Sequence, residues 1–330
     1  MGLTAPEREA AREKEAYEAG LNQFKQGNYG AAIAAFQGFM TSFANSALLP
    51  SAQYWIGNAH YALRDFKSAI LAQQKVVQSW PDNAKAPDAL LNIASSYLES
   101  GDQKTARETL QQLIKRYPTS PAAEQAKQRS RFVDRIRAAP LADIRKDPEL
   151  FNFALAGGRS AFQTNCSQCH GAGGAGSLGF PNLADDDWMW GGSLDQIYQT
   201  IQHGVRNADE KSRQTNMPRF GVDGLLTASQ VESVTGYVLS LSGQGKATPE
   251  GAKIFQEQCA ACHKADGKGN QEMGAPNLTD GIWLYGGDRN SVYRSIFYAR
   301  NGSMPAWGQR LDDATLKMLA VYVHSLGGGK

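Results

Sequence analysis

The chain has 330 residues, which is enough for two or three domains of ordinary size. Its 42% hydrophobic and 20% charged residues are typical of a soluble globular protein, and a formal net charge of +2 is too balanced to favour nucleic acid or an anionic membrane as a partner. No apolar run approaches the roughly 18–20 residues that cross a bilayer, so no transmembrane segment is predicted in this chain.

The first third of the sequence repeats with a period of 37 residues. A turn residue, a small alanine and an aromatic residue recur at this spacing: Gly27, Arg64 and Gly101; Ala32, Ala69 and Ala106; Phe43, Trp80 and Tyr117. Each unit is predicted to form two amphipathic helices that approach closely at the alanine. Paired helices at this period indicate tetratricopeptide-like repeats, so residues 1–127 are predicted to be a helical domain of three 37-residue repeats.

Part of this domain also resembles a particular repeat family. Over residues 16–127 the pattern A-x-Y-W-I-G-x-A-x-Y, followed by D-F and A, is similar to the C-terminal repeat domain of the periplasmic Tol–Pal-associated cell-division coordinator family. The resemblance implies that the domain binds a periplasmic protein partner and has no catalytic site. Residues 128–150 are charged and contain Pro140 and Pro148, which predicts a linker with one short helix.

The rest of the chain is internally duplicated. PNLADDDWMWGG at 181–192 matches PNLTDGIWLYGG at 276–287, and NMPRFG at 216–221 matches SMPAWG at 303–308. GYVLSLSG at 236–243 likewise matches VYVHSLGG at 321–328. We therefore predict two homologous helical segments, each closed by its own C-terminal helix. The first segment is residues 151–245 and the second segment is residues 246–330.

All four cysteines lie in two copies of C-x-x-C-H, one near the start of each segment. This is the attachment motif of c-type haem, because cysteines three residues apart can reach the two vinyl groups of one porphyrin and the adjacent histidine can bind the iron. The motif predicts two covalently bound haem c groups, attached at Cys166, Cys169, Cys259 and Cys262 with His170 and His263 on the irons. The predicted fold is all-α, a repeat domain followed by two tandem class I cytochrome c domains.

Other uses of these cysteines are less consistent with the pattern. Disulfides inside C-x-x-C would close very small loops and would leave His170 and His263 unexplained. A zinc site needs closed tetrahedral ligation, which three ligands on one side of a short helix supply poorly. A redox dithiol normally stands at the start of a βαβ unit, and no such unit is predicted here.

The sixth iron ligand is predicted to be a methionine in each segment. Met217 follows His170 by 47 residues, Met304 follows His263 by 41, and each methionine precedes a proline that fixes its loop. A thioether with an imidazole is the ligand set of electron-carrying cytochromes c. His203 is the competing ligand for the first haem, although the second segment has Tyr298 at the equivalent place. The remaining methionines of the two segments are predicted to be packing residues: Met189, Met273 and Met318.

Two further features of the segments suit a haem. The loops at 181–183 and 276–278 are predicted to hold the histidine ring through a backbone carbonyl. Four aromatic side chains with polar atoms suit a haem edge near its propionates, although core packing explains them equally well: Trp188, Trp190, Trp283 and Tyr285.

Residues 139–330 strongly resemble the dihaem cytochrome c subunit of cbb3-type cytochrome c oxidases, on stretches such as GFPNLADDDWMWGG and NGSMPAWGQRLDD. The resemblance implies the axial pairs His170 with Met217 and His263 with Met304. It also implies that the protein transfers electrons from a soluble cytochrome c or another donor to the membrane-embedded catalytic subunit. It further implies a periplasmic location. The charged start of the chain lacks the apolar region of a secretory signal, so a leader is expected to be absent from this numbering. The repeat domain stands where that family has an amino-terminal membrane helix, which predicts a fusion.

Three functions follow from these observations. The first is a dihaem electron-transfer protein, or electron-transfer subunit of an oxidase, with no turnover of its own. The second is an enzyme, a dihaem peroxidase, which requires one iron with an open position. The third is a periplasmic scaffold in which the repeat domain has the main role.

Overall fold

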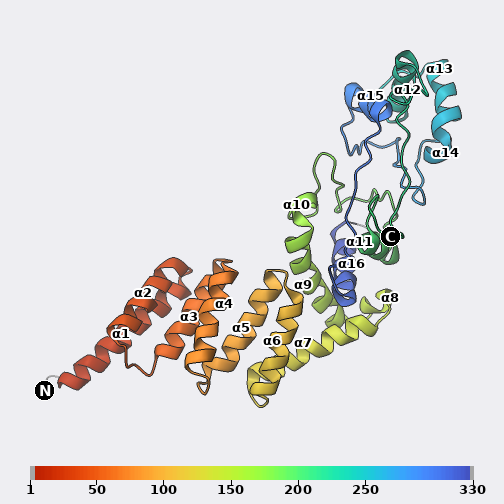
Figure 1. Cartoon of the computed structure of the whole chain (residues 1–330). Helices are drawn as coiled ribbons and strands as arrows, with labels where there is room; N and C mark the ends of the chain where they lie inside the picture. Colours follow the sequence, from red (N-terminus) through yellow and green to blue (C-terminus); the bar gives the residue numbers. More distant parts are fainter. Residues whose placement is uncertain (1–3, 328–330) are drawn as a thin grey trace. The chain divides into compact units, whose positions relative to one another are not determined.

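The computed structural model describes residues 4–327, so the outermost three residues of the predicted ranges 1–127 and 246–330 lie outside the described part. Over residues 4–327 the regular structure is helical, with no β-strand, which confirms the predicted all-α class. The chain divides into two compact units, 1–132 and 133–330. The helices of the first unit are α1 (Ala5–Lys25), α2 (Tyr29–Ser42), α3 (Leu49–Ala62), α4 (Phe66–Ser79), α5 (Lys85–Glu99), α6 (Gln103–Arg116) and the first part of α7 (Pro121–Ala138) (Figure 1).

The 37-residue period is visible in the backbone of the first unit. Helices α2, α4 and α6 begin at residues 29, 66 and 103, and the three alanines at the repeat position are fully buried. The turn residues before these helices all have positive φ: 80° at Gly27, 60° at Arg64 and 87° at Gly101. The aligned arginine therefore occupies a left-handed turn that glycine adopts more easily. Asp65 and Asp102 cap α4 and α6 by accepting from Ser68 and Thr105 backbone N–H groups, at 3.1 and 3.0 Å.

The segment 128–150, predicted to be a linker with one short helix, is mostly helical. Helix α7 continues to Ala138, the short α8 spans Leu141–Ile144, and α9 begins at Pro148. The two prolines mark helix starts, because Pro140 is the N-cap of α8 and Pro148 is the first residue of α9. Proline is well tolerated there, since its missing N–H would have no partner within the helix.

The second unit contains the duplicated sequence. The first segment supplies α9 (Pro148–Asn165), α10 (Ser167–His170), α11 (Leu194–His203) and α12 (Ala228–Leu241). The second segment supplies α13 (Pro249–Ile254), the π-helical turn η1 (Phe255–Cys259), α14 (Ala260–His263), α15 (Arg289–Tyr298) and α16 (Asp313–Gly327). No described helix is long and apolar enough to span a membrane.

The two segments exchange their C-terminal helices. The last helix of the chain, α16, packs on α9 and α11 of the first segment, whereas α12 packs on α13 and α15 of the second (Figure 1). Equivalent aromatic pairs mark the two contacts, Phe162 with Tyr322 at 5.4 Å between ring centroids and Phe255 with Tyr237 at 5.1 Å. The prediction that each segment is closed by its own C-terminal helix is therefore wrong. Each helix closes the other segment, and the two form interlocked bodies.

A glycine lies where the helices cross in each body. A Cβ on Gly158 would lie 2.1 Å from the backbone oxygen of Met318, and one on Gly251 would lie 2.3 Å from that of Ser233. Both glycines stand four residues before the aromatic residue of their own helix, and both backbone oxygens stand four residues before the facing tyrosine. The two crossings are thus equivalent, and each requires glycine because the obstructing atom is backbone.

Gly158→Ala and Gly251→Ala are expected to destabilise the second unit by about 1–3 kcal/mol each, because the added methyl cannot fit without moving a helix backbone. Gly157→Ala is the matched control, since its Cβ would meet only the flexible end of the Met318 side chain. Urea unfolding of the three variants measures the difference. Equal stability of the Gly157→Ala and Gly158→Ala proteins would contradict this account of the crossing.

Candidate haem sites

The two C-x-x-C-H motifs adopt the same backbone conformation. Each first cysteine interrupts the helix, with φ −117° at Cys166 and −114° at Cys259, and a one-turn helix then carries the second cysteine and the histidine. The residue after each histidine has positive φ, 75° at Gly171 and 62° at Lys264. A Cβ on Gly171 would meet nothing closer than 3.8 Å, so this turn favours glycine for its φ and not for close packing.

Each histidine ring is fixed by a backbone carbonyl, as predicted. Nδ1 of His170 lies 3.0 Å from the oxygen of Pro181, and Nδ1 of His263 lies 3.0 Å from that of Pro276. A carbonyl only accepts, so Nδ1 carries the proton and the lone pair of Nε2 is left for a metal ion. Burial lowers the pKa of both histidines, against the opposing effect of these hydrogen bonds, which favours the neutral ring that binds a metal.

The surroundings of the first cysteine of each motif disfavour a thiolate; Cys259 is buried and Cys166 is half-buried. Burial, with a smaller contribution from the neighbouring cysteine, raises the pKa of Cys166 and of Cys259 to about 12. Among residues 4–327 no three histidine, cysteine or acidic side chains converge as a metal site. All four cysteines are free of disulfides.

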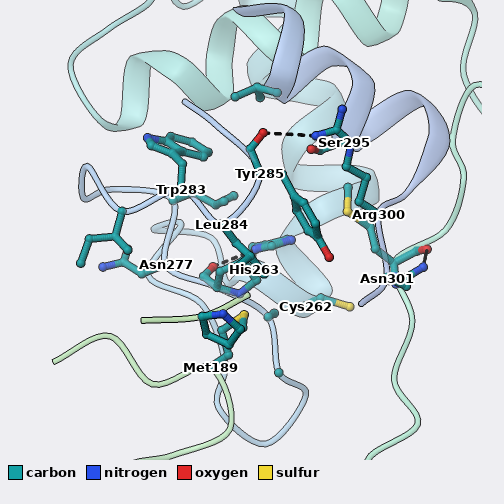
Figure 2. A pocket seen from close by; sticks show the side chains of 18 of the residues that line it. Met189, Cys262, His263, Asn277, Trp283, Leu284, Tyr285, Ser295, Arg300 and Asn301 are labelled. Atoms are coloured by element: carbon teal, nitrogen blue, oxygen red, sulfur yellow. Dashed lines mark hydrogen bonds between the residues drawn. The ribbon is translucent and has the colours of Figure 1, made fainter. Parts of the chain in front are cut away.

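A cavity of about 470 Å³ lies beside the second motif. Cys259, Cys262 and His263 line it together with side chains that are mostly apolar or aromatic (Figure 2). Residues of the first segment also form its wall, among them Phe180 and Pro181. The carbonyl that holds His170 thus belongs to a residue that lines the cavity of His263, so the two sites share a wall.

Two tryptophans offer hydrogen-bond donors without a protein partner. The Nε1 atoms of Trp188 and Trp283 are buried and unpaired, and Trp283 lines the cavity (Figure 2). A buried N–H without an acceptor costs free energy, so these donors indicate an acceptor supplied by a bound molecule. Carboxylates on a largely apolar ligand suit them. A haem fits this site on each count: the paired cysteines, the free Nε2, the apolar walls and the unpaired donors.

Met217 lies at the second motif and not at the first. It lines the cavity with His263, and its loop, residues 215–222, runs along the end of α15. The N–H groups of Gly221 and Val222 donate to the oxygen of Phe297 at 3.1 and 3.2 Å. The side chain of Asn301 accepts from Met217 N at 3.1 Å and donates to Met217 O at 3.2 Å.

Met304 takes the reciprocal position. Its loop, residues 302–308, runs along the end of α11 in the first segment, where Met304 and Val205 exchange backbone hydrogen bonds of 2.8 and 2.9 Å. Asn207 also donates to Met304 O, at 2.7 Å. The structure therefore does not bring Met217 to His170 or Met304 to His263. The expected pairing within each segment is wrong for the same reason as the expected helix packing, because in each segment the methionine loop and the C-terminal helix cross to the other body.

The alternative ligands are placed as follows. Met318 packs on α9 at Gly157, as predicted for a packing residue. Met189 and Met273 both line the cavity, so their surroundings are those of the site and not of a separate core. Nδ1 of His203 pairs with Asp209 at 3.1 Å, and the equivalent Tyr298 is 52% exposed.

Three residues that tie the methionine loops were missed in the sequence: Arg206, Asn207 and Asn301. The side chain of Arg206 contacts both loops, and each asparagine contacts one. The sequence does contain a pattern at these positions: the dipeptide Arg-Asn follows the equivalent helix in both segments, at 206–207 and 300–301. Polar residues at a helix end are common, so the dipeptide alone does not indicate a role.

The comparisons with known proteins agree with this site. The family model of cytochrome c matches residues 155–242, that of cytochrome c oxidase, cbb3-type, subunit III matches 246–323, and tetratricopeptide repeat models match 17–84 and 88–120. The chain is 56% identical over 197 residues to the cbb3-type cytochrome c oxidase subunit FixP of Bradyrhizobium diazoefficiens, covering 58% of this chain and 68% of that protein. It is 53% identical over 194 residues to subunit CcoP of Cereibacter sphaeroides, covering 58% and 67%.

The site and these matches define a c-type cytochrome, a protein that holds haem c covalently and transfers electrons. Within that class, the chain belongs to the family of subunit III of cbb3-type cytochrome c oxidases, whose members include CcoP and FixP. The resemblance given by its residues is thereby confirmed, as are the tetratricopeptide repeats before it.

The carboxyl of Asp187, which lies on the cavity wall, is expected to make the stability of the protein depend on pH. Burial, and then repulsion from Asp280, Asp185 and Asp186, raises the pKa of Asp187 to about 6. Because the folded-state pKa lies above the unfolded value of about 3.9, stability is lost as the pH rises through 6.

Asp187→Asn is therefore expected to stabilise the protein by up to about 1 kcal/mol above pH 7 and to have no effect near pH 4, the size being limited by the partial exposure of this carboxyl. Urea unfolding at both pH values measures it. Asp186→Asn removes the same charge from an exposed neighbour and should gain less. A gain for Asp187→Asn that is the same at both pH values would argue against ionisation as the cause.

Proposed function

We propose that this protein carries electrons through two haem c groups, from a soluble periplasmic donor toward the catalytic subunit of a cbb3-type oxidase. The observation that carries the proposal is the pair of C-x-x-C-H motifs with closely similar φ and ψ at their first cysteines, each with its histidine ring fixed by a proline carbonyl. Haem iron, when bound, takes up and releases one electron by alternating between its ferric and ferrous states. The chain attaches, orients and covers the group.

We further propose crossed axial pairs, His263 with Met217 and His170 with Met304. The first pair is supported by a common cavity, and the second by the backbone pairing of Met304 with Val205 beside α11. Each thioether then binds from the segment opposite to its histidine. Two protein ligands on each iron leave no open position, which favours electron transfer over the peroxidase alternative.

The partners and the location come from the family. The relatives are named as subunits of cbb3-type oxidases, which supports docking of this chain on such an oxidase in the periplasm. The donor is proposed to be a soluble cytochrome c or a protein of similar role.

Purified holoprotein is expected to contain two haem c groups, to retain its pigment in acid acetone and to show a c-type pyridine haemochrome spectrum. The reduced protein should give two upfield proton signals from iron-bound methionine methyls. Met217→Leu should remove one signal, and Met304→Leu the other. In the Met217→Leu protein, the haem that loses its methionine ligand should be the one attached to Cys259 and Cys262. The contacts of the porphyrin protons with nearby side chains identify which haem is affected. Loss at the haem on Cys166 and Cys169 would contradict the crossed pairs, and cyanide binding to the resting wild type would favour the peroxidase.

We propose that the repeat domain binds a periplasmic protein. Its support is the 37-residue repeat with buried alanines at each crossing and the matches to tetratricopeptide repeats. Unit 1–132 is compact by itself, so the segment used as bait should retain its fold. Capture from a periplasmic extract by residues 1–132, compared with capture by residues 133–330, is expected to give a protein specific to the repeats. Identical sets of captured proteins would refute this role, and with it the scaffold alternative.

A further inference from the structure

Arg206 contacts both methionine loops at once. Its Nε donates to the oxygen of Gly302 at 2.7 Å, and its Nη1 donates to the oxygen of Thr215 at 2.8 Å. Gly302 stands two residues before Met304, and Thr215 stands two residues before Met217. One guanidinium therefore spans the approaches to the two proposed iron ligands, which belong to different segments.

The surroundings of Arg206 are those of a positioned group. The side chain is half-buried on the wall of the cavity, and its guanidinium carbon lies 5.9 Å from the centre of the Trp190 ring. Among the described residues no carboxylate forms an ion pair with it, and its Nε and Nη1 both donate to backbone carbonyls. Only arginine offers donors in a rigid fork that can reach two carbonyls on different loops.

The backbone at Arg206 has a strained conformation. Its φ is +49°, in the left-handed region that residues other than glycine rarely adopt. The N–H of Arg206 donates to the oxygen of Arg213 at 2.7 Å, which holds the turn. Strain of this kind persists only where the surrounding contacts hold the residue in place, and the two loop carbonyls are such contacts.

The other polar contacts of the loops are local. Asn301 contacts only the loop of Met217, and Asn207 contacts that of Met304. The carboxamide of Asn301 pairs with the backbone N–H and carbonyl of Met217. At the other loop, the backbone N–H and carbonyl of Val205 pair in the same way with those of Met304. These contacts fix each methionine separately, whereas Arg206 joins the two.

We propose that Arg206 is a positioning residue that couples the two methionine ligands, holding both loops against their irons so that ligation at one haem depends on the same side chain as ligation at the other. The inference rests on the proposed roles of Met217 and Met304. It does not depend on which histidine each methionine opposes.

The test is Arg206→Gln in the holoprotein, read by the methyl signals of the iron-bound methionines and by displacement of each methionine with imidazole. Loss of the two hydrogen bonds should raise the affinity for imidazole about tenfold at both haems and broaden or shift both methyl signals. Asn301→Ala should affect only the signal of Met217.

Arg213→Gln is the matched control. Arg213 is half-buried over the same Trp190 ring, at 5.2 Å, but the contact of its side chain is with Thr200 and not with either loop. It should leave both methyl signals and the imidazole affinity unchanged. Arg206→Lys keeps the charge and loses the fork, so it should reproduce the effect at both haems, and it replaces Arg206→Gln if that variant yields no holoprotein.

Wild-type behaviour of the Arg206 variants, or an effect at one haem only, would overturn the coupling. Absence of methionine signals in the wild type would instead overturn the ligand assignment itself, so the two failures are distinguishable.

Discussion

The structure of the cytochrome part depends on one contact made twice, the crossing of an N-terminal helix by a C-terminal helix from the other segment. At each crossing a glycine lets two backbones touch, and an aromatic pair packs one turn away. A chain of about 90 residues buries a small core by itself. Exchange of the last helix and of the methionine loop makes each core a joint product of both segments, so neither segment is complete without the other.

The parts of the site that are local in sequence could be predicted. The carbonyls of Pro181 and Pro276 and the donors of Trp188 and Trp283 lie within 20 residues of the histidine of their own C-x-x-C-H motif, and their geometry follows from short stretches of chain. The repeat domain could also be predicted, since its period fixes helix starts that the structure reproduces at 29, 66 and 103. In both cases the contacts are between neighbours in the chain.

The exchange of C-terminal helices and methionine loops could not be predicted from the sequence, because the two segments carry the same pattern. Tyr237 and Tyr322 stand at the same place in two similar helices, and so do Phe162 and Phe255 in theirs. Either tyrosine suits either phenylalanine as far as size and spacing are concerned. The choice between them is made by the path of the chain, and residues such as Arg206, which act only after the exchange, give no pattern within one segment.

The exchange has a consequence for electron transfer. The loop whose Pro181 carbonyl fixes His170 also lines the cavity of His263, and the backbone N–H of Gly179 donates to the oxygen of Leu284 across the same boundary, at 2.8 Å. Two independent domains joined by a linker could vary the separation of their cofactors. Here residues such as Pro181 belong to both sites, so the separation is fixed by packing within the second unit. In the proposed function this arrangement lets an electron pass between two centres that need no encounter, and the two loops proposed to carry the iron ligands meet at one arginine.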